Sequence, residues 1–382
     1  MTTGIRTTYT DSNVKPESLN ALISLIDWRE APLLREFGIN NEKRFRFTFW
    51  PRTAYEWLED TLSSRTDTLA EAVDQGETAI DVVDGTKFKE GDIIKVESEL
   101  MYVSSVSSNT LTVVKGYAGT TDAAHSTALT VTLATVARLE GADYDTGHTT
   151  AVTRNINYTQ ILSEAVKVSG SQMVDENYGI DDEMAYHIAK LIGGGYGLGS
   201  KGTAGKLAIL LQQTFYYGQK AVGTTTSARA MGGFEEFVTT NVTNASSAAL
   251  TLKMIEDMLQ TSYLAGGKPD MLICNAWLRR KINSFFEGSI RTERTEDTGG
   301  HVIKTIETVF GDMEVMFDRW CPTDRIYLVE KEKLGWITYR PFQVLDRAST
   351  GDYEVKEVLG EFGFVLQNET AHGYIHTLST TS

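Results

Sequence analysis

The chain has 382 residues, 41% of them hydrophobic, so it is long enough to form two or three domains with a substantial buried core. A net charge of −15 leaves no basic surface for specific contact with DNA or RNA. The two cysteines, Cys274 and Cys321, form neither a disulfide framework nor a paired metal motif, which indicates a reducing compartment.

The first part of the chain, residues 1–45, is predicted to be a polar arm. Residues 1–15 lack the basic start and apolar run of a signal peptide, and no later stretch reaches the ~20 apolar residues that a membrane span requires. We therefore expect a soluble protein that is made inside the cell. One short amphipathic helix is expected before Pro32. Its apolar face consists of Leu19, Leu22, Ile23 and Ile26.

Extended structure is expected after the arm. Phe45, Phe47 and Phe49 alternate with polar residues, as in a strand with one apolar face. From about residue 66 to 134 the composition changes to short β-type runs separated by Gly, Asn or Ser turns. Five strands with no helical pattern between them indicate a small inserted β module. The five runs are residues 78–83, 92–96, 100–103, 111–114 and 129–133.

A strand and a short helix are expected next. Residues 157–168 have an extended pattern, Ser169 or Ser171 is suited to cap the short helix, and Gly179 is suited to end it. A serine hydroxyl accepts a hydrogen bond from the first turn of a helix, and glycine adopts the backbone conformation that ends one. This unit should lead directly into a longer helical region.

Two helix patterns lie within residues 181–218, separated by a glycine-rich run at 193–202. Apolar residues recur at helical spacing in both, and Gly218 offers a stop. A Walker phosphate loop would need a hydroxyl residue directly after its glycine–lysine pair, but Lys206 is followed by Leu207. A dinucleotide-binding loop would follow a strand rather than a helix. We interpret the run as a flexible elbow between two helices.

The rest of the chain mixes helices and strands. A helix at residues 252–259 should end at the glycines and proline of 266–269. Because the two element types alternate without a repeating βα rhythm, we predict an α+β fold. The later elements are a strand at 270–274, a helix at 276–286 and strands at 310–317, 325–329 and 363–367.

The sequence predicts no catalytic, cofactor-binding or metal site. No histidine starts an HExxH helix, and no serine lies in a nucleophile elbow. His372 and His376 are four residues apart, but no third ligand of suitable type lies nearby. Glu59 and Asp60 are adjacent on a strand, so their side chains should point to opposite faces and not converge on one substrate. We therefore expect a protein that is not an enzyme.

Two charged clusters have simpler interpretations. Asp181, Asp182, Glu183 and His187 lie at one predicted helix start, where carboxylates stabilise the positive end of the helix dipole. This cluster is expected to be a capped and solvated helix terminus. The basic triplet at residues 279–281 is expected to face solvent or an acidic neighbour.

Nine short motifs outside residues 66–134 occur in a definite order. They are Ala31-Pro32-Leu33-Leu34, Glu56-Trp57-Leu58-Glu59-Asp60-Thr61-Leu62, Glu140-Gly141-Ala142-Asp143, Asn157-Tyr158-Thr159-Gln160-Ile161, Val168-Ser169, Gly266-Gly267-Lys268-Pro269-Asp270, Phe310-Gly311, Tyr339-Arg340-Pro341 and Ala371-His372-Gly373-Tyr374-Ile375. Each motif alone is weak. In this order and spacing, the chain resembles the major capsid proteins of tailed phages with the Hong Kong 97-type fold.

The inserted module carries a second, independent resemblance to a small β module found in many phage structural proteins. Lys115 stands where that module usually has arginine. The likeness rests on Gly91-Asp92-Ile93-Ile94, Glu99-Leu100-Met101-Tyr102-Val103, Asn109-Thr110-Leu111-Thr112-Val113, Lys115-Gly116-Tyr117-Ala118-Gly119-Thr120 and His125. Two features depart from the capsid pattern: the glycine-rich run at 193–202, and Gln212-Gln213 where the long spine helix of the family tends to be acidic.

The capsid resemblance implies four parts. They are an N-terminal arm at 1–45, an extended loop at 46–156 with the β module at about 66–134, a peripheral domain with the spine helix at 157–237 and 341–382, and an axial domain at 238–340.

The resemblance also implies a function. The chain would assemble with itself, as hexamers and pentamers, into the icosahedral head shell around packaged double-stranded DNA, without sequence-specific DNA binding or a membrane. Portal, scaffold and decoration proteins are the other implied partners, and the protein would be found in the virion after assembly in the host bacterial cytoplasm. Two alternatives stay open: a tail-tube or adaptor protein, and an encapsulin-like compartment shell.

Overall fold

The structure is a computed structural model that describes residues 31–38, 52–60, 64–141, 152–175, 182–192, 205–286 and 305–381. The chain divides into a larger compact unit, Met1–Trp57 with Arg154–Ser382, and a smaller one, Leu58–Thr153. The helix expected at residues 19–26, the aromatic strand at 45–49 and the glycine-rich run at 193–202 lie outside the described residues.

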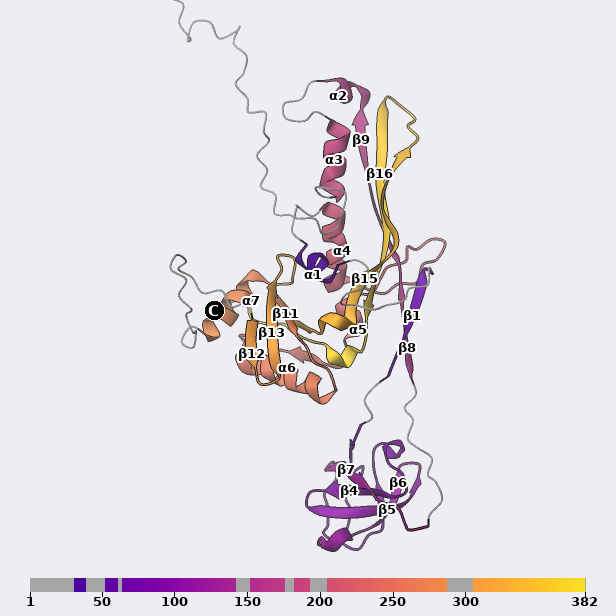
Figure 1. Ribbon diagram of the computed structural model, residues 1–382, viewed down its shortest axis with the longest axis vertical. Helices are drawn as coiled ribbons and strands as arrows, with labels where there is room; N and C mark the ends of the chain where they lie inside the picture. The colour runs from indigo at the N-terminus through magenta and orange to yellow at the C-terminus, as the bar shows by residue number, and fades with distance from the viewer. Residues whose placement is uncertain are drawn as a thin grey trace, which may run out of the picture. The chain divides into compact units, whose positions relative to one another are not determined.

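A six-stranded mixed sheet lies in the larger unit (Figure 1). In spatial order its strands are β10 (Val242–Asn244), β17 (Gly373–His376), β14 (Ile326–Val329), β11 (Met271–Cys274), β13 (Gly311–Phe317) and β12 (Thr305–Thr308). β10 pairs with β17 and β11 with β13 in parallel, and the other neighbours are antiparallel. Every residue of β11 and β14 is buried, because packed elements cover both faces of the sheet.

Helices α6 (Leu252–Leu264) and α7 (Ala276–Phe285) cover one face of this sheet. The paired residues Leu272 and Leu328 point toward these helices. The next pair along the strands, Ile273 and Tyr327, points toward the opposite face and another apolar core. Alternation along a strand thus divides the larger unit into two cores that share one sheet.

Both helices begin and end at residues suited to those positions. The Thr251 hydroxyl and the Asn275 side chain each accept a hydrogen bond from the first turn of their helix, at 3.3 and 2.8 Å. α6 ends before Gly266, whose φ of 88° costs a glycine little. The predicted helix from residue 252 and the predicted strand and helix from residue 270 are confirmed.

A three-stranded antiparallel sheet forms the second layer of the larger unit. Its strands, in spatial order, are β15 (Leu334–Arg347), β16 (Tyr353–Leu366) and β9 (Gln160–Ser169). Helices α3 (Glu183–Ile192) and α4 (Lys206–Tyr217) pack against it, at the positions where the sequence predicts two helices.

The length of β15 and β16 was not predicted. The sequence indicates a strand only at residues 363–367, which is the end of β16, and gives no strand at all for β15. Pro341 interrupts the β pattern there, because proline lacks the N–H that a central strand donates. β15 accommodates it because β15 is an edge strand whose pairing shifts register between Arg340 and Gln343.

Three short helices complete the described part of this unit. α2 (Gly170–Val174) begins at Ser169, whose hydroxyl accepts a hydrogen bond from the Gln172 N–H at 3.3 Å, so the first of the two proposed serines is the cap. α1 (Pro32–Phe37) and α5 (Phe234–Phe237) both pack on α4.

The smaller unit is an antiparallel six-stranded sheet around an aliphatic core. In spatial order the strands are β2 (Thr66–Thr68), β7 (Thr130–Val136), β4 (Asp92–Val96), β5 (Glu99–Ser107), β6 (Thr110–Val114) and β3 (Ala79–Asp81). All five predicted strands are present. β2 was missed because its three residues are polar and too few to show an alternating pattern.

A separate two-stranded sheet pairs β1 (Ala54–Glu59) with β8 (Thr153–Tyr158). Buried and exposed residues alternate along β1. Tyr55 and Trp57 are buried, and together with Ile337 and Val365 they form a small apolar cluster. A two-stranded sheet is not stable alone, so this packing is needed to hold it.

Candidate functional site

Helix α1 is held by a buried side chain of α4. The Leu33 N–H donates to Gln212 Oε1 at 3.2 Å, and Gln212 Nε2 donates in turn to Asp318 Oδ2 at 2.5 Å, in the loop after β13. α1 has Pro32 in its first turn, and Ala31 offers no side-chain cap. Gln212 therefore satisfies one of the N–H groups that a helix start leaves free. One buried glutamine joins three elements.

Asp318 is a fully buried carboxylate with several donors. The Tyr216 hydroxyl donates to its Oδ2 at 2.6 Å, and the Trp320 N–H donates to Oδ1 at 3.1 Å. Burial, and then the neighbouring Cys321 and Asp318, raise the pKa of Tyr216 well above its usual value, so this hydroxyl stays protonated. The donors offset the cost of removing the carboxylate from water.

Asn157, fully buried on β8, ties that strand to two distant segments. Its Nδ2 donates to Phe364 O at 2.7 Å and to Gly232 O at 3.2 Å, and its Oδ1 accepts from the Gly232 N–H at 2.9 Å. The Tyr55 hydroxyl of β1 also donates to Phe364 O, at 2.8 Å. The base of the β1–β8 sheet is therefore fixed by a group of hydrogen bonds to β16 and to the segment before α5.

Glu361 is the second buried anchor of this region. The Thr159 hydroxyl donates to it at 2.5 Å, Arg340 at 2.9 Å, and Arg229 also donates. Burial raises the pKa of Glu361, but the hydrogen bonds from Thr159, Arg229 and Arg340 outweigh burial, so the net pKa lies below its usual value. The charged carboxylate thus connects β16 to β15, to Thr159 between β8 and β9, and to the segment after α4.

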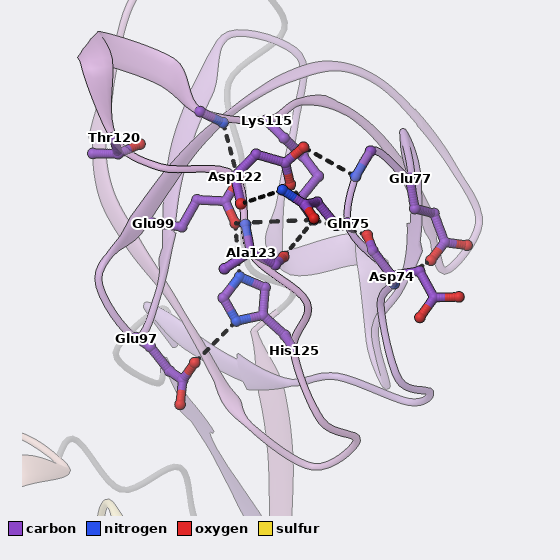
Figure 2. Close-up of polar contacts among 12 residues, drawn as sticks. Asp74, Gln75, Glu77, Glu97, Glu99, Lys115, Thr120, Asp122, Ala123 and His125 are labelled. Atoms are coloured by element: carbon purple, nitrogen blue, oxygen red, sulfur yellow. Dashed lines mark hydrogen bonds and ion pairs between the residues drawn. The ribbon is translucent and has the colours of Figure 1, made fainter.

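The smaller unit contains a buried polar network of its own, which Figure 2 shows. Lys115 Nζ lies 2.8 Å from Asp122 Oδ1 and 3.9 Å from Glu99 Oε2. His125 Nε2 lies 2.8 Å from the same Glu99 oxygen, and His125 Nδ1 lies 3.1 Å from Glu97 Oε2. Buried charges are tolerated when they are paired and hydrogen-bonded in this way.

Several of these residues lie in the sequence motifs described above, but the motifs do not predict their contacts. Asn157, Arg340, Glu99, Lys115 and His125 all fall within motifs that carry the two resemblances. Asn157 has a partner 207 positions away, whereas Glu99, Lys115 and His125 contact one another within one stretch of the chain. In neither case did the spacing alone predict the contact. The buried glutamine and aspartate of the α1 anchor were missed, and Gln212 was noted only as a departure from an acidic pattern.

The charged helix start is capped as expected, but it is not fully solvated, because the Glu183 side chain is only 16% exposed. Asp182 Oδ1 accepts a hydrogen bond from the Ala185 N–H at 2.9 Å, and Glu183 Oε1 lies 3.1 Å from His187 Nε2 one turn later. Both contacts are local to α3, as capping and surface pairing require. Asp181 lies outside the described residues.

His372 and His376 do not form a pair of metal ligands. His372 is fully buried, its Nδ1 accepts from the Glu330 N–H at 3.2 Å, and its Nε2 donates to Gln367 O at 3.2 Å. Burial lowers the pKa of His372 to about 3, so the ring is neutral. His376 Nδ1 lies 2.7 Å from the Thr377 hydroxyl. Among the described residues, no group of three His, Cys, Asp or Glu side chains could hold a metal ion.

The other candidates also lack converging chemistry. Glu59 is buried and Asp60 is exposed, as predicted for neighbours on a strand. Of the basic triplet, Arg280 is exposed, and Arg279 is half-buried and donates to the Val315 carbonyl oxygen. Cys274 and Cys321 are free and buried, and burial raises the pKa of the Cys274 thiol to about 12.

In the larger unit these arrangements anchor segments to one another. No described helix is both long and apolar enough to cross a bilayer. The buried anchors lie where α1 and the β1–β8 sheet join the larger unit.

Solved structures identify the fold. The cyanophage A-1(L) capsid asymmetric unit matches with a TM-score of 0.56 at 11% identity, covering 98% of this chain and 100% of that chain. The capsid of a native GTA particle matches with a TM-score of 0.52 at 11% identity, covering 97% and 98%. A chain from Mycobacterium phage Bobi matches with a TM-score of 0.51 at 12% identity, covering 97% and 98%. The fold is the Hong Kong 97-like fold of phage capsid proteins.

The family follows from a direct match. A family model described as SU10 major capsid protein matches residues 1–379, so the chain belongs to the SU10 major capsid protein family. No curated protein matches the chain. The predicted α+β capsid fold and the predicted function in the head shell are confirmed, and the family favours the capsid over the tail-protein and compartment interpretations.

Proposed function

We propose that the chain forms an icosahedral shell of hexamers and pentamers around packaged double-stranded DNA, and that it does so without enzymatic activity. The observation that carries this proposal is the anchoring of two segments to the larger unit. Gln212 and Asp318 hold α1, and Asn157 holds the β1–β8 sheet to β16 and to the segment before α5. A subunit built to bridge its neighbours needs firmly fixed segments that extend from a stable core.

Exposed apolar residues near the β1–β8 sheet support a contact with another copy. Leu58 on β1 is 70% exposed and Val152, just before β8, is 54% exposed. Large apolar side chains of this kind on a thin sheet have no core of their own to enter. We propose that a neighbouring subunit covers them in the shell.

We propose the following structural roles for the parts of the chain. Residues 1–45 act as the arm and 46–156 as the extended loop that carries the β module at about 66–134. Residues 157–237 and 341–382 act as the peripheral domain, and 238–340 as the axial domain. The three-stranded sheet with α3 and α4 supports the peripheral part of this division, and the six-stranded sheet with α6 and α7 supports the axial part. β17 is an exception, because residues 373–376 lie within the six-stranded sheet.

The net charge also bears on the proposed partners. A chain with a net charge of −15 repels DNA at long range, so packaged DNA is confined by the shell without being gripped. Portal, scaffold and decoration proteins are the other proposed partners, and assembly is proposed to take place in the bacterial cytoplasm. These partners would meet the subunit in the course of shell assembly.

Electron microscopy of the purified protein, together with its elution volume on a sizing column, tests the proposal. Closed shells, or sheets of hexamers, are the expected result, in the presence of the scaffold protein if the subunit alone stays monomeric. Stacked rings or tubes would contradict the proposal. Shells that fail to retain packaged DNA would contradict the genome-enclosing role while leaving the shell role intact.

Deleting residues 1–30 tests the arm. The shortened subunit is expected to fold, because α1 and its anchor at Gln212 stay in place, but it should not form regular shells. Circular dichroism and thermal unfolding report folding, and microscopy reports assembly. Normal particles from this deletion would remove the arm from the assembly mechanism.

A further inference from the structure

The buried network of the β module brings one amine and two carboxyl groups together. Lys115 Nζ lies 2.8 Å from Asp122 Oδ1 and 3.9 Å from Glu99 Oε2. The side chains of Lys115 and Glu99 are 4% and 1% exposed. Figure 2 shows Asp122 beside Glu99, with His125 below both. An amine, a carboxyl acceptor and a second carboxyl group are the components needed to form an amide bond between side chains.

The other contacts of Lys115 orient its nitrogen. Nζ donates to Asp74 O at 2.9 Å and to Ala123 O at 2.7 Å. Asp122 Oδ1, in contrast, is buried and accepts no hydrogen bond of suitable geometry. Two of the ammonium hydrogens therefore point to backbone carbonyls. When the third is lost, the nitrogen lone pair is left on the side of the carboxyl groups, because the nitrogen is tetrahedral.

The acceptor, Asp122, is polarised by the backbone. Its Oδ2 accepts a hydrogen bond from the Gly76 N–H at 3.0 Å. A backbone N–H in this position stabilises the negative charge that develops on a carboxyl oxygen under nucleophilic attack. Asp122 keeps 32% of its side chain exposed, which leaves a path for a departing water molecule.

The second carboxyl group, Glu99, is placed to move protons. Its Oε1 accepts from the Gly116 N–H at 2.9 Å, and its Oε2 from the Ala123 N–H at 3.2 Å. The same Oε2 lies 2.8 Å from His125 Nε2 and faces Lys115 Nζ. A buried carboxylate next to both an amine and an imidazole can accept a proton from one and exchange it with the other.

We propose that Lys115 and Asp122 form an intramolecular isopeptide bond in the folded module, with Glu99 as the catalytic proton carrier. The Lys115 Nζ–Asp122 Cγ bond forms and the Asp122 Cγ–Oδ1 bond breaks. Two of the three ammonium protons leave with Oδ1 as one water molecule, by way of Glu99. The third stays on the amide nitrogen, and Oδ2 becomes the amide oxygen, still bound to the Gly76 N–H. The reaction requires no oxidant, cofactor or metal.

Folding supplies the driving force that dilute amines and carboxylates lack in water. Well-oriented groups within one molecule reach effective concentrations of about 10⁵–10⁸ M, which outweighs the competition from solvent water. Exclusion of water also disfavours the separated charges of the reactants. Lys87 and Asp67, 2.8 Å apart in the same module, provide an internal comparison, because 27% of the Lys87 side chain stays in solvent.

Mass spectrometry of the full-length protein tests the proposal, after incubation of the folded chain at neutral pH. The expected intact mass is lower than the sequence mass by one water molecule. Trypsin should leave residues 96–138 as one peptide, uncut at Lys115 and lighter by one water, with no fragment ions from between Lys115 and Asp122. An intact mass equal to the sequence mass, with normal cleavage at Lys115, overturns the proposal.

Three variants test whether the loss of water comes from the isopeptide bond or from another reaction. Lys115→Arg keeps the charge but cannot form the amide, so it should have the full mass; loss of water there would indicate an aspartyl imide and overturn the proposal. Asp122→Asn should lose one ammonia instead of one water, if the module folds as judged by circular dichroism. Glu99→Gln should slow the loss of water at least tenfold; an unchanged rate would remove Glu99 from the reaction.

Discussion

The two compact units of this capsid protein handle buried charge in different ways. In the larger unit, a buried carboxylate takes donors from distant parts of the chain: Thr159 and Glu361 are 202 positions apart. In the smaller unit the partners are near in sequence, and Glu99 and His125 are 26 positions apart. The smaller unit closes its contacts within one continuous stretch, so it suits an insertion. The larger unit depends on both halves of the chain.

The hydrophobic cores of the two units also differ. The larger unit is centred on Phe215, whose ring lies 5.0–6.3 Å from five other aromatic rings. The smaller core is mainly aliphatic, drawn from short strands. Aromatic rings bury large areas and pack in preferred geometries, so they can join segments from several elements at once. Substitutions should therefore damage the two units to different degrees.

The largest effect is expected at the centre of the aromatic core. Phe215→Ala should lower the free energy of unfolding by about 3–5 kcal/mol, because it leaves a cavity among the five rings. Urea unfolding followed by tryptophan fluorescence measures the change. Tyr217→Ala, at an exposed position of the same helix, is the matched control and should cost little. Equal losses in the two variants would mean that the core is not centred on Phe215.

Acid should weaken the larger unit through His372. Its pKa is about 3 when folded and 6.5 in its ordinary state, so only the unfolded chain gains the proton between these values. The stability is complete above pH 6.5 and falls as the pH drops toward 3, by up to about 5 kcal/mol. Denaturant unfolding across this range should be less pH-dependent in His372→Gln. An identical slope in both proteins would contradict the assignment.

A smaller effect is expected at the α1 anchor. Gln212→Ala leaves the Leu33 N–H without its acceptor and removes one of the two donors to Asp318 Oδ2, which should cost about 1–3 kcal/mol. Hydrogen exchange in α1 should accelerate more than exchange in α6. Gln213→Ala, next to it on α4 and only half-buried, is the control. Unchanged protection of α1 in Gln212→Ala would show that apolar packing alone holds this helix.

The smallest effect on the shell is expected from removing the β module. Excision of residues 66–134, with the ends joined by a short flexible linker, should leave a subunit that folds and assembles, because the module closes its own contacts. Microscopy and sizing chromatography measure assembly, and the unmodified chain serves as the reference. Insoluble protein would show that the module has a structural role in the subunit.

Local patterns predicted most of the elements of this fold. Apolar periodicity located α3, α4, α6 and α7, and short β runs located five strands of the module. β15 and most of β16 were not predicted, because Pro341 and their charged distal halves break the pattern that a buried strand shows. Pairing between the two strands, rather than burial, stabilises those distal halves, and pairing leaves little trace in a single sequence.

The anchors were harder to predict than the elements. In the sequence, Gln212 looks like a solvent-exposed polar residue of an amphipathic helix. In the structure it is fully buried, because α1 and Asp318 both lie against it. Likewise, Lys115 follows a strand and Asp122 lies in a loop, and only the fold of the module brings them together. Contacts of this kind depend on tertiary structure, so residue type and spacing alone cannot reveal them.

The position of β17 has a consequence for the timing of synthesis. This strand, Gly373–His376, lies between β10 and β14, so the six-stranded sheet stays open until residues 373–376 have left the ribosome. Contacts between distant parts of a chain form late during synthesis. A nascent subunit therefore cannot connect β10 to the rest of this sheet before residues 373–376 have been synthesised.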